Sequence, residues 1–460
     1  MPEMPTLSGL PVLGCLPELG RDRLGLLLRA YREGGDMVRV PLPRRRLYVA
    51  TSPAIANAVL RQEAASFMKF FALARLSRPV LGDGLVTSEG ALHRRQRKLI
   101  APGLTRREVG RYADAMARHS EETQRRWSAG ETLDVHAEMT RLTLGIASET
   151  MFGTSAEEHA RAAGDAIHAA TSYIAHGVGA LVHLPLSWPL PRHVRMRRAV
   201  ATLDEIVFDI IRERRADPSP HDDILGMLLA AQDEDDGATM SDAQVRDEVM
   251  TLFVAGHETT ANALTWALYL LARNPEAAER LADEARSVLG GRPPTLGDLP
   301  ALPYALQVFK ETMRLYPPAY MVGREATAPV SVEGWAIPDK ATLLLSIYGM
   351  HRRPDLFPDP ERFDPERFTP EREQALPRGA YLPFADGPRV CIGNHFALME
   401  GQIVLAHLAQ HVRLRSRAGE VVPPQPRVTL RPSRAVSLEV ERRRAGREGG
   451  DAAAATRSGG

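Results

Sequence analysis

Two short segments of the sequence combine residue types that could do chemistry. The first, Phe384–Gly393 (F-A-D-G-P-R-V-C-I-G), holds Cys391, one of the two cysteines of the chain. A Gly- and Pro-containing loop leads to this cysteine, and we expect a helix to begin directly after it. Helix N-termini favour anions and lower the pKa of a thiol, so one interpretation of Cys391 is a metal-binding thiolate. The other is an inert buried cysteine.

The second segment is the polar cluster Gly256–Thr260 (G-H-E-T-T), in the middle of a long apolar stretch. Burying such groups costs free energy unless they are paired or used. Glu258 and Thr259 are an acid and an alcohol suited to delivering protons. Alternatively, Thr259 bonds the carbonyl four residues earlier and Glu258 is a paired acid. A zinc motif H-E-x-x-H is excluded, because its fifth position is Ala261.

A long helix must carry the second segment. Ser241 and Gln244 form an S-x-x-Q capping box, the helical periodicity runs to Arg273, and Asn274-Pro275 ends it. A helix of about 33 residues is roughly 50 Å long and crosses a whole domain. Because its middle is nearly all apolar or small, we expect it to be buried on most sides.

The remaining pattern is mainly helical with a minor β region, in one large domain. A hairpin is expected at 37–41 and 46–50, a helix at 304–316, and strands at 330–337 and 342–346. A coil is expected at 351–383 and a last long helix at 392–411. We place the domain at 21–441, between an irregular Pro/Gly-rich segment, 1–20, and a disordered tail, 442–460.

The composition bounds the class of protein. The chain has 460 residues, 44% hydrophobic and 25% charged, which excludes a fibrous or wholly disordered chain. The net charge of +1 gives no signal for nucleic acid. Two cysteines exclude a four-cysteine metal site and favour a reducing, cytoplasmic location. No apolar run reaches the roughly 18 residues of a membrane span, so none is expected.

The Cys391 segment resembles the haem-ligand loop of the cytochrome P450 family, F-x-x-G-x-R-x-C-x-G, at every specified position. Further resemblances follow the order of that family and extend from about residue 10 to 440. They are Glu311–Arg314 (E-x-x-R), Phe363–Phe368 (P-E-R-F), Ala255–Thr260 (A-G-x-[DE]-T-T) and Gly90–Arg97 (G-x-x-H-x-x-x-R). The resemblance implies the P450 fold, with haem between the long central helix and the Cys391 loop and C-terminal helix.

The same resemblance implies roles around the haem. Cys391 would be the axial thiolate of haem b, a ligand that favours O–O bond cleavage, with O₂ as co-substrate. Phe384 would shield the sulfur, and Gly387 and Gly393 would let the loop turn and approach the porphyrin. On the long helix, a local distortion would free a backbone carbonyl, and four residues would receive O₂ and protons. These are Ala255 and Gly256, which leave room for O₂, Glu258, which relays protons, and Thr259, which holds a water or the bound peroxide.

Cations and one buried network complete the implied site. Two haem propionates need cationic partners, and bidentate arginines suit carboxylates. The residues implied are His93, Arg97, Arg324 and Arg389. Glu311, Arg314 and Arg367 would form a buried triad that locks the coil to the core, whereas on spacing alone Glu311 and Arg314 could be a weak surface pair.

An apolar pocket would hold a lipophilic substrate such as a fatty acid, terpene, steroid or macrolide-like product. By resemblance its walls are 68–85, 172–188, the long helix near Phe253, 319–322 and the loop near Pro432. The residues singled out are Phe70, Phe71, Leu85, Phe253, Ala255, Tyr320, Met321 and Val322. Lys69 could anchor a carboxylate, but we expect it to face solvent.

Electrons would come from a separate protein, because the sequence contains neither a P-loop nor a dinucleotide fingerprint. A ferredoxin or flavodoxin is expected, steered by a basic cluster, and an ordinary basic helix face is the equal alternative. The cluster consists of Arg94, Arg95, Arg97, Lys98, Arg106 and Arg107. Arg94 and Arg95 fall on other helix faces than the haem partners. We expect a monomer.

The expected function is therefore an O₂-dependent monooxygenase that hydroxylates or epoxidises a lipophilic molecule. Residues 317–368 resemble the membrane-anchored branch of the family, yet a soluble bacterial enzyme fits better. One alternative is a peroxide-using haem-thiolate enzyme, which the presence of both Glu258 and Thr259 disfavours. The other is a non-catalytic haem sensor or carrier, which would need neither residue.

Overall fold

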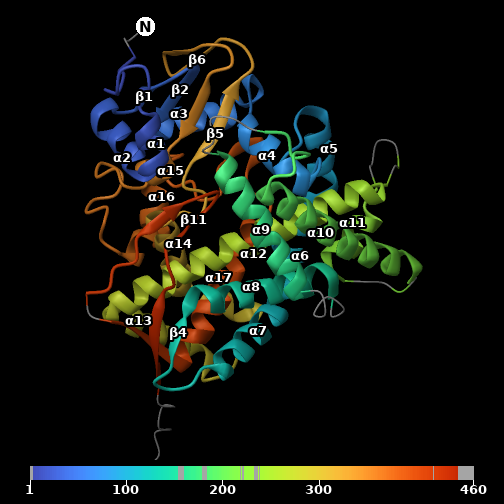
Figure 1. The fold of residues 1–460 in the computed structure, drawn as a ribbon. Helices are drawn as coiled ribbons and strands as arrows, with labels where there is room; N and C mark the ends of the chain where they lie inside the picture. Colours follow the sequence, from blue (N-terminus) through green and yellow to red (C-terminus); the bar gives the residue numbers. More distant parts are fainter. Residues whose placement is uncertain are drawn as a thin grey trace, which may run out of the picture.

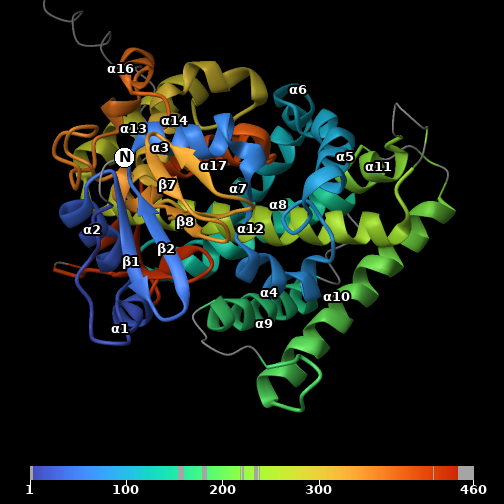
Figure 2. The same ribbon diagram turned by 90° about the horizontal axis from the view of Figure 1, so that it is seen from above.

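The structure, a computed structural model, describes residues 4–153, 160–178, 184–217, 219, 222–232, 237, 239–417 and 419–443. Figure 1 shows one group of strands at one side of the molecule, helices filling most of the rest and a further strand among the helices at the opposite end, with α12 (Asp242–Arg273) crossing the middle. Figure 2, seen from above, shows α12 running from beneath the β region to the far side of the helical part. Among the described residues, no helix combines the length and apolar character that crossing a bilayer requires.

The helices of the N-terminal half are α1 (Leu16–Arg21), α2 (Arg23–Gly34), α3 (Pro53–Asn57), α4 (Phe71–Leu81), α5 (Gly90–Ile100), α6 (Arg106–Val109), α7 (Ala113–Arg126), α8 (Val135–Phe152), α9 (Ala160–Val178) and α10 (Pro191–Ala216). Those that follow are α11 (Ile224–Ala230), α12, α13 (Pro275–Leu289), α14 (Pro303–Leu315), α15 (Ile347–Met350), α16 (Pro370–Ala375) and α17 (Asn394–His411). Helices α7, α8, α12, α14 and α17 pack around one large apolar core.

The strands form four small sheets. They are β1 (Met37–Leu42), β2 (Arg45–Ala50), β3 (Phe67–Lys69), β4 (Thr132–Asp134), β5 (Val322–Ala326), β6 (Val330–Val332), β7 (Trp335–Ile337), β8 (Thr342–Leu345), β9 (Val412–Ser416), β10 (Pro424–Pro426), β11 (Leu430–Pro432) and β12 (Ser437–Arg442). The largest sheet has the order β1-β2-β8-β5-β3, in which only the β2–β8 pair is parallel. It brings β3 and β5, far apart in the sequence, side by side.

Helix α12 forms as its end signals predict. The backbone N–H of Gln244 donates to the Ser241 hydroxyl over 3.3 Å, and the Gln244 side chain accepts from the Ser241 N–H over 3.0 Å. The helix ends at Arg273, and α13 begins at Pro275, the first-turn position that tolerates proline. Residues 242–273 form one uninterrupted α-helix, so the expected local distortion does not break the helix.

Several other expectations need correction. The irregular N-terminal segment ends earlier than residue 20, because α1 starts at Leu16. The strand expected at 330–337 is a β6–β7 hairpin, and the 351–383 coil contains a 3₁₀ turn at Pro365–Phe368 and helix α16. The tail was expected to start too early in the chain. Arg442 is the last residue of β12, and Nη1 of Arg443 forms an ion pair with Glu279. The rest of the expected tail lies outside the described residues.

Candidate active site

A cavity of about 470 Å³ lies between α12 and the loop that carries Cys391. This volume is within the usual range of small-molecule sites, roughly 300–1,000 Å³. Most of its wall is apolar. From α12 it receives residues spaced three and four apart, the spacing of one helix face. They are Thr251, Leu252, Ala255, Gly256, Thr259, Thr260 and Ala263.

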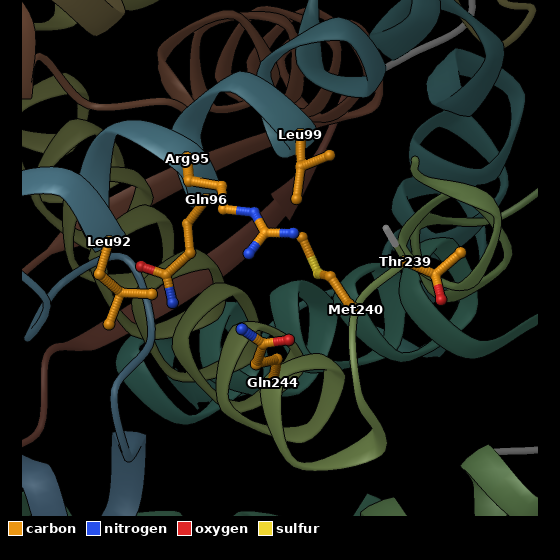
Figure 3. A pocket seen from close by; sticks show the side chains of 7 residues that line it. All are labelled: Leu92, Arg95, Gln96, Leu99, Thr239, Met240 and Gln244. Atoms are coloured by element: carbon orange, nitrogen blue, oxygen red, sulfur yellow. The ribbon is translucent and has the colours of Figure 1, made fainter. Parts of the chain in front are cut away.

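A second hollow, between α5 and the start of α12, is too small to be this site. Figure 3 shows that Leu92, Arg95, Gln96 and Leu99 of α5 face Met240 and Gln244 across it. Its volume of about 10 Å³ accommodates roughly one water molecule.

The Cys391 loop is held in place by its own backbone and by residues 58–62. The Cys391 N–H donates to the Phe384 carbonyl over 2.9 Å, and Asp386 forms an ion pair with Arg61 at 2.9 Å. Gly387 has φ +74°, and a Cβ there would lie 1.9 Å from the Leu60 carbonyl oxygen. Gly387 therefore lets the loop turn against Leu60, and it does not itself line the cavity.

Cys391 is exposed to the cavity, not to the outer surface of the molecule. Burial raises the pKa of its thiol, and the Gly393 backbone N–H and the Arg97 charge act in the opposite direction. Arg97 is fixed beside it, because its Nη1 donates to the Val390 carbonyl over 2.8 Å. A metal ion would complete the stabilisation of a thiolate here. Phe384 also lines the cavity.

Cations gather at one edge of the cavity. Arg389 forms an ion pair with Glu89 at 2.8 Å, whereas Arg324 donates to the carbonyl of Gly323. Burial lowers the pKa of Arg324 to about 10 and that of His93 to about 4. The expected propionate partners all lie on this cavity wall: His93, Arg97, Arg324 and Arg389.

Lys69 joins the same edge, although the sequence analysis expected it to face solvent. Its Nζ donates to the carbonyls of Leu85 and Ser88 at 2.8 and 2.7 Å, and burial lowers its pKa to about 8. It lies directly opposite Arg324 in the β3–β5 ladder. Like charges opposite each other destabilise a sheet, and the charge of the Glu89 carboxylate offsets part of this repulsion, because it raises the pKa of both residues.

These features fit haem. Haem is flat and largely apolar, carries two carboxylates on one edge, and has an iron that takes a thiolate ligand. The cavity offers a thiol on one wall, cations on one edge, and two glycines that leave space free. A Cβ added to Gly256 or Gly393 would meet no atom within 4 Å.

The acid and the alcohol of the α12 cluster point in different directions. The Thr259 hydroxyl lines the cavity and donates to the Ala255 carbonyl over 2.7 Å. This carbonyl therefore has a partner, whereas the sequence analysis expected a free carbonyl on the helix. Glu258 does not line the cavity; its Oε1 accepts from the Thr429 hydroxyl over 2.7 Å. Thr429 also accepts from Asn262, which contacts His136. Glu258 thus belongs to a polar network on another face of α12.

Five of the residues proposed for substrate contact line the cavity and two do not. Phe253 packs against the rings of Phe152 and His257, and the Tyr320 hydroxyl is held by Arg23 and the Arg427 carbonyl. Those two assignments were wrong. The side chain of Phe71 lies outside the described part of the chain. The five that line it are Phe70, Leu85, Ala255, Met321 and Val322.

The expected walls also need correction. No described residue of 172–188 lines the cavity, and the loop that reaches it contributes Arg427 and Val428, not Pro432. The sequence analysis missed the wall formed by α8 and α11, which supplies Ala147, Thr150, Met151 and Ile224. It also missed Glu400 of α17. Helix α8 packs along α12, and this packing brings Ala147, Thr150 and Met151 to the cavity.

Glu311 and Arg314 of α14 meet Arg367 in a network beneath the site. Nε and Nη2 of Arg314 donate to the two oxygens of Glu311 at 2.7 and 2.8 Å, and Arg367 Nε lies 3.5 Å from Glu311 Oε1. Arg314 also donates to the carbonyls of His351, Pro360 and Arg362. These bonds attach the 351–368 coil to α14, the helix that borders the cavity.

The basic cluster of α5 and α6 is divided by the fold. Arg94, Lys98, Arg106 and Arg107 are exposed. Arg97 turns to the cavity and Arg95 to the small hollow. The surface that a redox partner would meet is therefore narrower than the sequence suggested.

Comparisons with known proteins agree with this geometry. A family model described as "Cytochrome P450" matches residues 2–439. Cyclooctatin synthase of Streptomyces melanosporofaciens is 37% identical over 429 residues, 92% of each chain. Cyclooctat-9-en-7-ol 5-monooxygenase of the same organism is 36% identical over 427 residues, 91% of this chain and 92% of the relative. Pentalenene oxygenase of Streptomyces avermitilis is 32% identical over 442 residues, 95% and 97% of the two chains.

Proposed function

The chain belongs to the cytochrome P450 family, and on that premise we propose that it inserts one oxygen atom of O₂ into a terpene hydrocarbon or terpene alcohol. It is an oxidoreductase, a haem-thiolate monooxygenase of a lipophilic small molecule that takes electrons from a redox partner. The observation that carries the proposal is that Cys391, from its loop, and Thr259, from α12, line the same largely apolar cavity.

We propose haem b as the cofactor and Cys391 as its axial ligand. When bound, haem supplies the iron at which O₂ is activated to oxygenate a C–H or C=C bond. Arg97 holds the Val390–Cys391 backbone and favours the thiolate by its charge. The propionates are assigned to the cationic edge, where Lys69 joins His93, Arg97, Arg324 and Arg389.

We assign substrate binding to apolar side chains of the cavity wall and proton transfer to two residues of α12. Phe70, Leu85, Met321 and Val322 form an apolar surface on the wall of the cavity. This favours an uncharged guest, as the printed names of the relatives also do. Thr259 positions a water, and Glu258 exchanges protons through the Thr429 network.

For electron transfer we propose a ferredoxin or flavodoxin, because the exposed Arg94 and Lys98 lie on α5, the helix that also carries His93 and Arg97 of the cavity wall. Two free thiols suit a cytoplasmic location. We also propose a monomer, which light scattering coupled to gel filtration tests directly.

The deciding experiment has two stages. First, the reduced, carbon-monoxide-bound protein should give the red-shifted Soret band of thiolate ligation, and Cys391→Ser should abolish it. Second, the protein is incubated with a surrogate ferredoxin, its reductase, NADPH and ¹⁸O₂. The panel of terpenes includes pentalenene and cyclooctat-9-en-7-ol. One ¹⁸O atom in a product is the expected result.

Two outcomes would overturn the proposal. Turnover with hydrogen peroxide alone, and none with O₂ and NADPH, would identify a peroxide-using enzyme. A normal thiolate spectrum with tight gas binding, no substrate-induced spin shift and no product would identify a sensor or carrier.

A further inference from the structure

One short loop of the cavity wall is bonded to charged side chains of two different elements. Residues 82–88 connect α4 to α5, and two consecutive residues of this loop, Leu85 and Val86, line the cavity. The Leu85 carbonyl accepts from Lys69 of β3 over 2.8 Å. The shape of this part of the wall therefore depends on where the loop is held.

Two consecutive acids of α12 hold the backbone of the same loop. The Asp83 N–H donates to Asp247 Oδ2 over 2.8 Å, and the Leu85 N–H donates to Glu248 Oε2 over 3.0 Å. Hydrogen bonds to an ionised acceptor are roughly twice as strong as neutral ones. Glu248 has no solvent exposure, and burying a carboxylate costs free energy unless it is paired or hydrogen-bonded. The bond to the loop offsets that cost.

The loop also packs directly onto the helix. A Cβ on Gly84 would lie 2.2 Å from Thr251 Oγ1 and 2.5 Å from the Asp247 carbonyl oxygen, so any larger residue would displace the loop or the helix. The Asp247 side chain is fixed in turn, because its Oδ1 accepts from Arg246 over 2.8 Å. Arg246 Nε donates to Asp204 of α10 over 2.7 Å. Contacts thus run from α10 through α12 to the cavity wall.

We propose that Asp247 and Glu248 are positioning residues that determine which substrates the cavity admits, because they hold Leu85 and Val86 in one place; this inference rests on the proposed monooxygenase function. Neither acid lines the cavity, so both act on a substrate only through the loop. With both bonds intact, the wall selects guests by shape. When the bonds are weakened, the loop moves away from α12 and the cavity accepts guests of more varied size.

The bond to Glu248 should make this selection depend on pH. Burial raises the pKa of Glu248 to about 7; the Leu85 N–H opposes this rise, the Asp247 charge adds to it and the Lys69 charge opposes it. Lys69, with a pKa of about 8, stays mainly protonated up to about pH 7.5. Protonation of Glu248 weakens its bond to the loop, so selectivity should decrease as the pH falls from about 7.5 to about 6.

Hydrogen exchange of the resting holoenzyme tests the positioning role without turnover. The double variant Asp247→Asn/Glu248→Gln keeps both side-chain volumes and removes both charges. In this variant the amides of residues 83–85 should exchange at least about tenfold faster, because local opening of the loop becomes easier. Asp242→Asn is the matched control on the same helix, since Asp242 forms its ion pair with α10. It should keep the wild-type rates.

Substrate titrations then test the selection. The spin-state shift gives the dissociation constants of limonene, farnesene, pentalenene and cembrene, terpene hydrocarbons that differ in size and shape. In the double variant, the ratio between the weakest and the tightest constant should fall at least about fivefold at about pH 7.5. In turnover, KM should change more than kcat. Glu248→Gln should remove the pH dependence of the ratio, and Gly84→Ala, which displaces the loop by volume alone, should also lower it.

The outcomes separate the two proposals. If no terpene of the panel shifts the spin state of the wild type, the proposed function fails, whereas the exchange rates still decide whether the two acids hold the loop. If terpenes bind, the positioning role is overturned by wild-type exchange at residues 83–85 in the double variant, by an unchanged ratio, or by an equal effect of Asp242→Asn.

Discussion

Both oxygens of the Glu311 carboxylate are bonded to the Arg314 guanidinium, at 2.7 and 2.8 Å, and neither side chain has any solvent exposure. A buried bidentate pair is highly directional, and removing one partner leaves an uncompensated charge in the interior. Here the remaining bonds of Arg314 reach three carbonyls of the coil that follows α15, so the pair also fixes the chain path beneath the site.

We therefore expect Glu311→Ala to lower the free energy of unfolding by about 3–5 kcal/mol and to yield protein that does not retain haem. Thermal unfolding and the haem-to-protein ratio measure this. Glu121→Ala is the control, because it breaks an i,i+4 pair with the exposed Arg125 and should cost only about 0.3–0.5 kcal/mol. Soluble, haem-replete Glu311→Ala protein would contradict the prediction.

The like-charged pair Lys69–Arg324 predicts opposite effects on the two forms of the protein. Arg324→Met keeps the aliphatic stem and removes a buried cation, so the haem-free protein should not lose stability. The loaded protein should release haem at least about tenfold faster, because a charge-assisted bond contributes about 1.5–3 kcal/mol. Transfer of haem to an excess of acceptor globin gives the rate. The exposed Arg94→Met should match the wild type; if Arg324→Met does so too, Arg324 does not hold the propionates.

Thr259→Ala should divert electrons from product to hydrogen peroxide, because the hydroxyl that we propose to hold a water in the cavity is lost. Product and peroxide formed per NADPH measure the change. Thr265→Ala is a close control: Thr265 bonds the carbonyl four residues earlier in the same way, at 2.6 Å, but lies away from the cavity. Equal coupling in the two variants would mean that only the shared backbone bond matters.

The stability of the protein should fall in acid partly through His351. The Leu382 N–H donates to its Nε2 over 3.0 Å, so Nδ1 carries the hydrogen and faces the Arg314 carbonyl. Burial, with the charge of Arg314, lowers the pKa of His351 to about 3. The unfolded chain then binds the proton more readily, and stability decreases as the pH falls from about 6.5 towards 3.

Replacing this residue should make the decline shallower. Between pH 6 and pH 4, His351→Gln should reduce the slope of stability against pH by up to about 1.4 kcal/mol per unit, whatever its effect at neutral pH. Denaturant unfolding at several pH values gives the slopes. His395→Gln, an exposed histidine, should keep the wild-type slope, and an equally steep decline in His351→Gln would contradict the assignment.

Charge reversal on α6 should slow reduction by an acidic donor. Arg106→Glu/Arg107→Glu should lower the second-order rate with a ferredoxin most at low ionic strength, where the screening length exceeds about 10 Å, and the rates should converge at high salt. Stopped-flow reduction measures this. Arg44→Glu/Arg45→Glu makes the same charge change in the β1–β2 turn. An equal effect of both doubles would indicate net charge and not a docking surface.

The local signals in the sequence explain which elements were predictable. Helix α12 carries a capping box and an Asn-Pro stop, so its ends were predicted within one residue. Helix α1 has six residues and no periodicity of its own. Its position depends on packing against α2, and such tertiary contacts are not visible in a local pattern.

The site was less predictable because it depends on which way side chains point. Helical spacing of three or four residues from Thr259 selects Ala255, Gly256 and Ala263 as lining residues. The same spacing does not exclude Phe253, three before Gly256, or Glu258, three after Ala255, so it could not show that these two side chains point elsewhere. Tyr320 precedes β5, so strand alternation does not apply to it.

The positions of Lys69 and Glu400 on the cavity wall could be found only from the three-dimensional structure. The first faces Arg324 through a pairing of two short strands that are about 250 residues apart in the chain. The second meets Thr260 only because α17 lies against α12. No local pattern specifies either contact, and both concern charged groups that are rarely buried.

The hydrogen bond between Arg97 and the Val390 carbonyl spans 293 positions of the chain. At the usual rate of synthesis, about 5–20 residues per second, the ribosome needs about 15–60 s to travel from one partner to the other. During that time the N-terminal wall has left the exit tunnel without the loop that carries the thiol. Haem capture must therefore await nearly the complete polypeptide, and the nascent chain depends on chaperones or on its own helix packing to keep an unfinished apolar wall from aggregating.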